Sequence, residues 1–160
     1  MLTMRMKKLI VGVAVLVAPM LALAQSPAQL IEKYTPLVSN NPEFAKVLVT
    51  GLRDGTEVVF KAGRTPRNWI SFTPPTGKMG YGNVDNALTL AQGSLASLNI
   101  VTGTPQSGQR AVTLFDVKAV LMGGNVTTPQ NTTITLPGVL ILRSQDLGWG
   151  EISQKLNVKL

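Results

Sequence analysis

The chain has 160 residues, and none of them is cysteine or histidine. No disulfide can hold the fold together, so its stability has to come from a buried hydrophobic core. The same absences exclude cysteine nucleophiles, Ser-His-Asp triads, zinc sites with histidine ligands and haem with a histidine ligand. Any catalysis would have to use carboxylates, and we predict no cofactor and no metal site.

The N-terminal segment has the pattern of a secretory signal peptide. Basic residues precede an apolar run at residues 9–23, which ends in the sequence Ala-Leu-Ala. This run is shorter than the roughly 20 apolar residues that a membrane-spanning helix needs. We therefore predict a signal peptide at residues 1–24, a mature chain that begins at Gln25, a periplasmic or secreted location, and no membrane span after cleavage.

Residues 25–160 have the length of one globular domain. Their apolar periodicity predicts a single, helix-dominated α+β domain with about five to six short helices and one or two β-hairpins. Helices are expected at 27–34, within 41–55, at 83–98, within 111–124, at 137–146 and at 150–156. Strands are expected at 56–62, at 70–72 and in a hairpin within 125–136, whereas 101–110 is predicted to be a surface loop.

One phrase occurs twice, as MGYGNVDNAL at 79–88 and as LGWGEISQKL at 147–156. Glycine, aromatic residue and glycine precede a predicted helix in both copies, and Gly148 is expected to close the preceding helix in a left-handed conformation. We interpret the aromatic residues as plugs at the helix starts. The alternative is an anion site that uses bare helix amides. The structural motif consists of Gly80, Gly82, Gly148, Trp149 and Gly150.

Most of the eight carboxylates occupy positions with a structural role. Asp54 precedes a glycine at a turn, whereas Glu43, Asp85 and Glu151 fall in the first turns of predicted helices. A glycosidase needs two carboxylates that face each other across a sugar, and the spacing brings no such pair together. We predict no catalytic residue. A carboxylate-dependent hydrolase of envelope glycans is one alternative.

Basic residues are densest in FKAGRTPRNW, at residues 60–69. Loss of the signal peptide removes three of the fifteen basic residues and no acidic one, so the formal charge falls from +7 to +4. This mild excess does not indicate nucleic-acid binding, but it allows contact with an anionic envelope polymer or an envelope protein. The candidate binding residues are Lys61, Arg64, Arg67, Trp69, Lys78 and Tyr81.

Three stretches, GLRDGTEV, PTGKMGYGNV and LPGVLILRSQDLGWGEISQKLNVKL, resemble an uncharacterised family of small exported proteins of Gram-negative bacteria. The chain departs from the family pattern in the loop VTGTPQSG and at Asp146-Leu147. The resemblance implies an exported protein and carries no activity. We predict a non-catalytic exported protein that binds or interacts with components of the cell envelope. A further alternative is an inhibitor or adaptor of an envelope enzyme, which would present residues 64–69.

Overall fold

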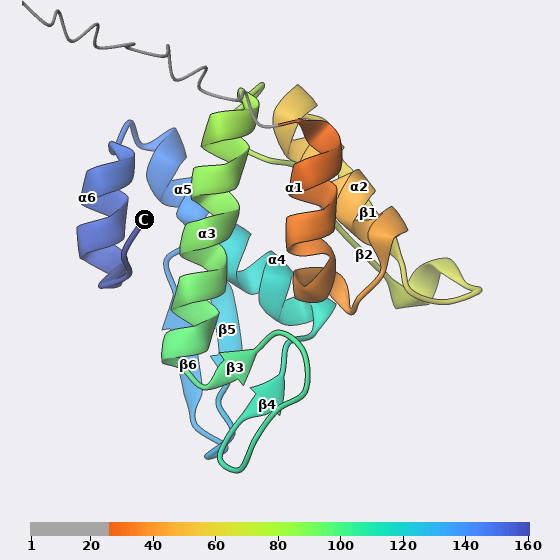
Figure 1. Cartoon of the computed structure of the whole chain (residues 1–160), viewed down its shortest axis with the longest axis vertical. Helices are drawn as coiled ribbons and strands as arrows, with labels where there is room; N and C mark the ends of the chain where they lie inside the picture. Colours follow the sequence, from red (N-terminus) through yellow and green to blue (C-terminus); the bar gives the residue numbers. More distant parts are fainter. Residues whose placement is uncertain (1–25) are drawn as a thin grey trace, which may run out of the picture.

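The computed structural model describes residues 26–160, so the predicted signal peptide and the start at Gln25 lie outside the described residues. This part of the chain forms one α+β domain with six α-helices and three two-stranded sheets, which confirms the predicted fold class (Figure 1). The elements are α1 (Pro27–Tyr34), the 3-10 helix η1 (Thr35–Val38), α2 (Pro42–Asp54), β1 (Val58–Lys61), the 3-10 helix η2 (Pro66–Asn68), β2 (Trp69–Phe72), α3 (Tyr81–Ser97), β3 (Ile100–Val101), β4 (Arg110–Ala111), α4 (Leu114–Met122), β5 (Gly124–Thr127), β6 (Thr133–Leu136), α5 (Val139–Ser144) and α6 (Trp149–Leu156).

The first two helices begin at caps that their own sequences provide. Ser26 and Gln29 form a capping box, in which each side chain accepts a hydrogen bond from the backbone N–H of the other residue. Asn41 caps α2, and Pro42 takes its first position. Gly55, with a φ of 67°, ends α2. Local residues therefore set the limits of α2 where the sequence predicts them.

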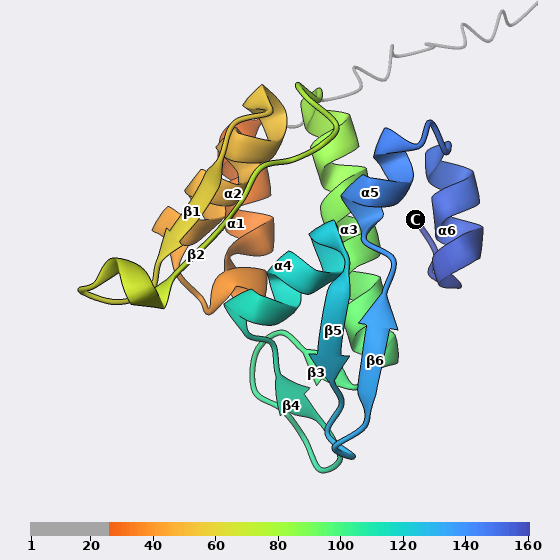
Figure 2. The same ribbon diagram turned by 180° about the vertical axis from the view of Figure 1, so that it is seen from behind.

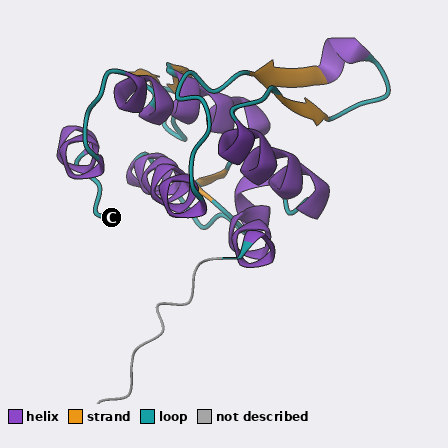
Figure 3. Ribbon diagram, turned by 90° about the horizontal axis from the view of Figure 1, so that it is seen from above, coloured by secondary structure: helices purple, strands orange, loops and turns teal. Residues whose placement is uncertain are grey.

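Helix α3 lies at the centre of the molecule and contacts α1, α2, α4, α5 and α6 (Figures 1 and 3). Its buried residues recur at helical spacing and occupy more than one face, because it is surrounded by other helices. They are Val84, Ala87, Leu88, Leu90, Ala91, Ser94 and Leu95. Full burial of a leucine side chain contributes about 1.5–3 kcal/mol, so α3 supplies much of the core. None of the helices in residues 26–160 is both long and apolar enough to span a membrane.

Both predicted hairpins are present. Strands β1 and β2 pair antiparallel with Phe60 opposite Ile70, and β5 and β6 pair antiparallel with Val126 opposite Ile134. The predicted loop at 101–110 is exposed in its middle, but its ends form the parallel pair of β3 and β4. Such a short pair leaves no periodic pattern in the sequence.

Several helix limits differ from the prediction. Helix α3 begins at Tyr81, two residues before the predicted start at Asn83. Helix α5 covers only Val139–Ser144, not 137–146, because Gly138 before it has a φ of 82° and Asp146 after it has a φ of 64°, and neither conformation belongs to a right-handed helix. Helix α6 begins at Trp149, one residue before the predicted start.

Candidate functional site

The β1–β2 hairpin forms an arm whose strands lie against α2 and α4 and whose loop, with η2, projects beyond the helices (Figures 1 and 2). We define the arm as residues 58–72. Its inner face is apolar, since Phe60, Ile70 and Phe72 are buried. The Phe60 ring lies 5.6 Å from that of Phe44 on α2 and 6.3 Å from that of Phe72. These aromatic contacts fasten the base of the arm to the core.

Trp69 lies on the outer face of the arm, because successive side chains of a strand point to opposite faces. The Trp69 side chain is 37% exposed, and its indole N–H donates a 3.1 Å hydrogen bond to the carbonyl oxygen of Gly63. Lys61 pairs with Trp69 across the hairpin and places Nζ 4.9 Å from the centre of the ring. This cation–π contact and the hydrogen bond fix the ring while leaving part of it accessible.

The arm and the segment that follows it carry the excess positive charge. The described residues include twelve basic and eight acidic side chains, but no acidic residue lies within 58–84. That range holds four basic residues, namely Lys61, Arg64, Arg67 and Lys78. Elsewhere in the described chain eight basic residues are matched by eight acidic ones. The four cations are exposed and take part in none of the ion pairs found among the described residues.

The repeated phrase forms two equivalent helix starts. Gly80 precedes α3 with φ and ψ of −70° and 157°, and Gly148 precedes α6 with −66° and 155°. Tyr81 and Trp149 are the first residues of the two helices. The backbone is therefore the same in both copies: an extended glycine followed by an aromatic residue in helical conformation.

An arginine covers each of the two aromatic rings. The guanidinium carbon of Arg53 lies 5.3 Å from the centre of the Tyr81 ring, and that of Arg143 lies 5.1 Å from the centre of the Trp149 ring. Both aromatic side chains are half-buried and pack against the core. They cover the edge of the core at the helix starts, where the sequence predicts aromatic plugs, and neither ring is fully buried.

The two copies differ in how they are capped, and they touch each other. Glu151 Oε2 accepts a 2.6 Å hydrogen bond from the backbone N–H of Gly148. Asn83 stands at the matching position of the first copy, but its Oδ1 accepts a 2.8 Å hydrogen bond from the indole N–H of Trp149. Helix α3 therefore has no side-chain cap of its own. The Asn83 side chain instead binds Trp149 and so connects α3 to α6.

The expected left-handed conformation of Gly148 is wrong. The residue with positive φ in this turn is Asp146, at 64°, which follows α5. Aspartate tolerates this conformation better than most residues. A Cβ atom at Gly80, Gly82 or Gly150 would meet no atom within 4 Å, so packing does not require glycine there.

An open cleft of about 250 Å³ lies beside the start of α3, and its polar lining includes Lys78, Asn83, Arg143 and Asp146. A second cleft, of about 360 Å³, is also lined by Lys78, together with Arg53, Asp54 and Tyr81. Each cleft contains one carboxylate beside its arginine, so Lys78 provides the only excess positive charge among these lining residues. The clefts favour an anion only weakly, and the anion site remains a prediction.

Three ion pairs form among the described residues: Lys33–Asp85 at 2.6 Å, Arg53–Asp54 at 2.5 Å and Arg110–Asp116 at 2.7 Å. With the Glu151 cap, four of the eight carboxylates therefore have a structural partner. Glu151 lies in the first turn of α6, as the sequence predicts. Asp85, which was assigned the same role, instead connects α3 to α1.

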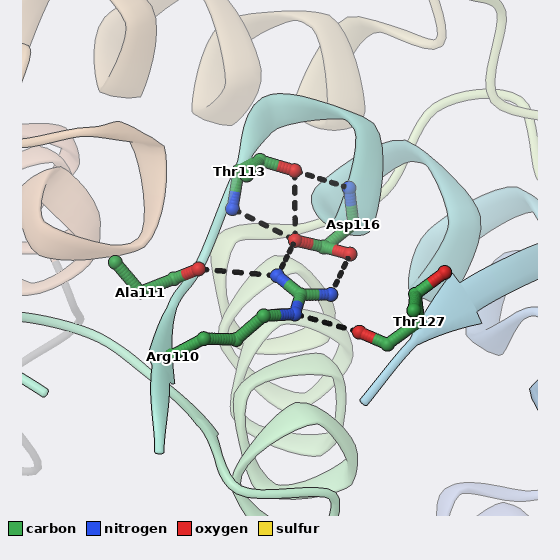
Figure 4. Close-up of polar contacts among 5 residues, drawn as sticks. All are labelled: Arg110, Ala111, Thr113, Asp116 and Thr127. Atoms are coloured by element: carbon green, nitrogen blue, oxygen red, sulfur yellow. Dashed lines mark hydrogen bonds and ion pairs between the residues drawn. The ribbon is translucent and has the colours of Figure 1, made fainter. Parts of the chain in front are cut away.

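Arg110 and Asp116 form the most buried of these pairs (Figure 4). Two guanidinium nitrogens of Arg110 donate to the two carboxylate oxygens, and Nε donates to the carbonyl oxygen of Thr127. Thr113 donates to the same carboxylate from its backbone and its hydroxyl group. Burial raises the pKa of Asp116, but the hydrogen bonds from Arg110 and Thr113 outweigh it and hold this pKa below its usual value.

A second polar cluster connects α1 to α3. The buried Tyr34 side chain donates from its hydroxyl group to Asp85 Oδ1 at 2.6 Å, and lies 2.9 Å from the hydroxyl group of Thr89. Lys33 Nζ donates to the same Asp85 oxygen at 2.6 Å. Burial, followed by the hydrogen bond to Asp85, raises the pKa of Tyr34. The cluster satisfies a buried hydroxyl group and joins two helices.

The structure brings four of the six candidate binding residues together on the arm: Lys61, Arg64, Arg67 and Trp69. Lys78 and Tyr81 follow the other end of β2, where the chain enters α3. Sequence reasoning missed Arg53, Asn83 and Arg143. Arg53 and Asn83 contact aromatic residues distant in the sequence, whereas Arg143 reaches Trp149 across the turn between α5 and α6. No group of three or more possible metal ligands occurs within residues 26–160.

Comparison with known proteins adds no relative. The chain matches no protein-family model, and neither a curated protein nor a solved structure matches it. The resemblance to small exported proteins of Gram-negative bacteria therefore stays a prediction.

Proposed function

We propose that this is a non-catalytic exported protein of the cell envelope that binds an anionic envelope polymer through the β1–β2 arm. The observation that supports this most strongly is the charge of the arm. Lys61, Arg64 and Arg67 are exposed on a projecting hairpin, and none of them pairs with an acidic side chain of the described chain.

Cations that form no ion pair within the described chain are available to an external anion. Residues 58–84 hold no acidic residue, and none of the ion pairs of the described chain neutralises Lys61, Arg64 or Arg67. Such a patch attracts polyanions over a distance of roughly 10 Å at 0.1 M salt. The excess positive charge of the described chain is thus concentrated in the segment that includes its most projecting element.

Two alternatives use different parts of the molecule or a different partner. A glycan hydrolase would depend on carboxylates, of which Asp85 and Asp116 are already held by internal partners. An inhibitor or adaptor would present the same arm to an envelope enzyme. Binding to protein-free glycan distinguishes our proposal from the second alternative, and release of soluble fragments distinguishes it from the first.

The test compares two variants of equal net charge for binding to isolated, protein-free peptidoglycan sacculi. The arm variant carries Lys61→Ala, Arg64→Ala and Arg67→Ala. The control variant carries alanine at three exposed lysines on the helices, namely Lys46, Lys118 and Lys155. Co-sedimentation measures the bound fraction at about 50 mM and 500 mM salt, two conditions between which screening rises steeply.

We expect the wild type and the control variant to sediment with the sacculi at low salt and to dissociate at high salt. The arm variant should stay in solution at both salt concentrations. No soluble glycan fragment should appear. Equal binding by the two variants would refute the role of the arm, and fragment release that Asp146→Asn abolishes would support the hydrolase.

A further inference from the structure

We infer that the ligand of the arm is an acidic polysaccharide, whose sugar rings stack on Trp69 while their carboxylates pair with the basic side chains. This inference rests on the proposed function and adds the chemical class of the ligand. It follows from the one large aromatic side chain on the outer face of the arm. Charge alone would not distinguish a sugar acid from any other polyanion.

Trp69 is held as a rigid and partly exposed surface. The hydrogen bond to Gly63 satisfies the indole N–H internally, so the ring does not need a polar partner from outside. What remains available is the apolar ring, of which Lys61 covers part. An aromatic ring with a negative face attracts C–H groups, and a sugar ring presents such groups on its flat side.

One cation contacts this ring, and another lies close to it in the sequence. Lys61 is opposite Trp69 in the hairpin register, and Arg67 belongs to the short helix η2 that immediately precedes Trp69. A guanidinium group can bind a carboxylate through two parallel hydrogen bonds. A ligand that carries a carboxylate on a sugar ring therefore matches both parts of the surface at once.

Two other polyanions match the surface less well. Polyphosphate has no apolar face, so it would use the cations and leave Trp69 without a role. A loop that inserts into an anionic membrane needs large apolar side chains at its tip. Residues 62–68 have none, because their only apolar residues besides Gly63 are Ala62 and Pro66. Trp69 lies at the base of the loop rather than at its tip.

The experiment measures binding of the wild type and three variants to soluble polygalacturonate, polyphosphate, neutral dextran and vesicles rich in phosphatidylglycerol. The variants are Trp69→Ala, Trp69→Phe and the control Phe115→Ala, which removes an aromatic side chain that is 72% exposed on α4. Circular dichroism confirms that each variant is folded. Trp69→Phe keeps a ring and serves if Trp69→Ala does not fold.

We expect Trp69→Ala to weaken binding to polygalacturonate about tenfold, as loss of an aromatic contact does, and binding to polyphosphate by less than about twofold. Trp69→Phe should lose less, and Phe115→Ala should bind as the wild type does. Dextran should not bind detectably. An equal loss for both polyanions, no loss for either, or tighter binding to the vesicles would overturn the inference. The proposed function would still stand if the triple arm variant had lost binding to sacculi.

Discussion

Arg110 illustrates how one side chain can organise residues that the sequence places in a loop. It joins the end of the 102–109 loop, the start of α4 and the end of β5 through hydrogen bonds to Asp116, Ala111 and Thr127 (Figure 4). The side chain of Asp116 is only 7% exposed and that of Arg110 is 27% exposed. Loss of either partner would leave a charge in a poorly hydrated position, which is costly.

We predict that Asp116→Asn lowers the free energy of unfolding by about 2–4 kcal/mol at pH 7. The variant loses the ion pair and weakens the cap that Thr113 and Asp116 form at α4. The pKa of Asp116 is lowered in the folded state, so its contribution is complete above the unfolded pKa of about 3.9. It is lost as the pH falls through the lower folded value.

Urea unfolding at pH 7, 5 and 3 measures this contribution. The difference between the wild type and Asp116→Asn should shrink towards pH 3. The control is Asp54→Asn, which removes a more exposed pair and should change stability by less than about 1 kcal/mol. A difference that does not depend on pH would show that the carboxylate charge contributes nothing.

At the scale of the elements, the repeated phrase is used to join two helices. Each copy starts a helix with the same backbone and the same arginine-covered aromatic residue. Trp149 of the second copy then donates to Asn83 of the first. The hydrogen bond joins the two helix starts, and α3 and α6 pack against each other.

We predict that Trp149→Ala lowers the free energy of unfolding by about 2–3 kcal/mol and Tyr81→Ala by about 1–2 kcal/mol. Both side chains are half-buried, so the loss is smaller than for a fully buried aromatic residue. Trp149 loses more because the hydrogen bond to Asn83 disappears as well. Lys78→Ala should melt like the wild type, since Lys78 is exposed and unpaired within the described chain.

Thermal melts with and without phosphate also test the anion site that the sequence allows. Near-native melting of both aromatic variants would contradict the structural role of the phrase. A melting temperature that phosphate raises in the wild type but not in Lys78→Ala would support the anion site instead.

At the scale of the whole molecule, the sequence predicts the elements better than the contacts between them. Caps and breakers such as Asn41 and Gly55 act locally, so they set helix limits that can be predicted. Partners distant in the sequence, such as Tyr34 and Asp85, depend on how helices pack, and no local pattern identifies them. The turn before α6 was misassigned because glycine is compatible with either conformation, and Asp146 takes the left-handed one.

The candidate site likewise combines features that the sequence predicts with features that depend on the fold. The basic residues and Trp69 are close in the sequence, so the arm could be predicted as one group. The projection of its loop and the absence of an acidic partner within residues 26–160 depend on the fold, and they are visible only in the structure (Figures 1 and 2). The helices form a charge-balanced body, and the arm carries most of the excess charge of the described chain.

The most direct test of the central claim maps the bound surface residue by residue. The chain from Gln25 onwards, labelled with ¹⁵N, is titrated with oligogalacturonate, and the amide and indole N–H signals are followed by NMR. We predict that the shifted signals belong to residues 61–69, with the indole N–H of Trp69 among the largest shifts. Shifts centred on Lys78, Asn83 and Arg143 would place binding in the cleft beside α3, and would contradict the claim that the arm is the binding surface.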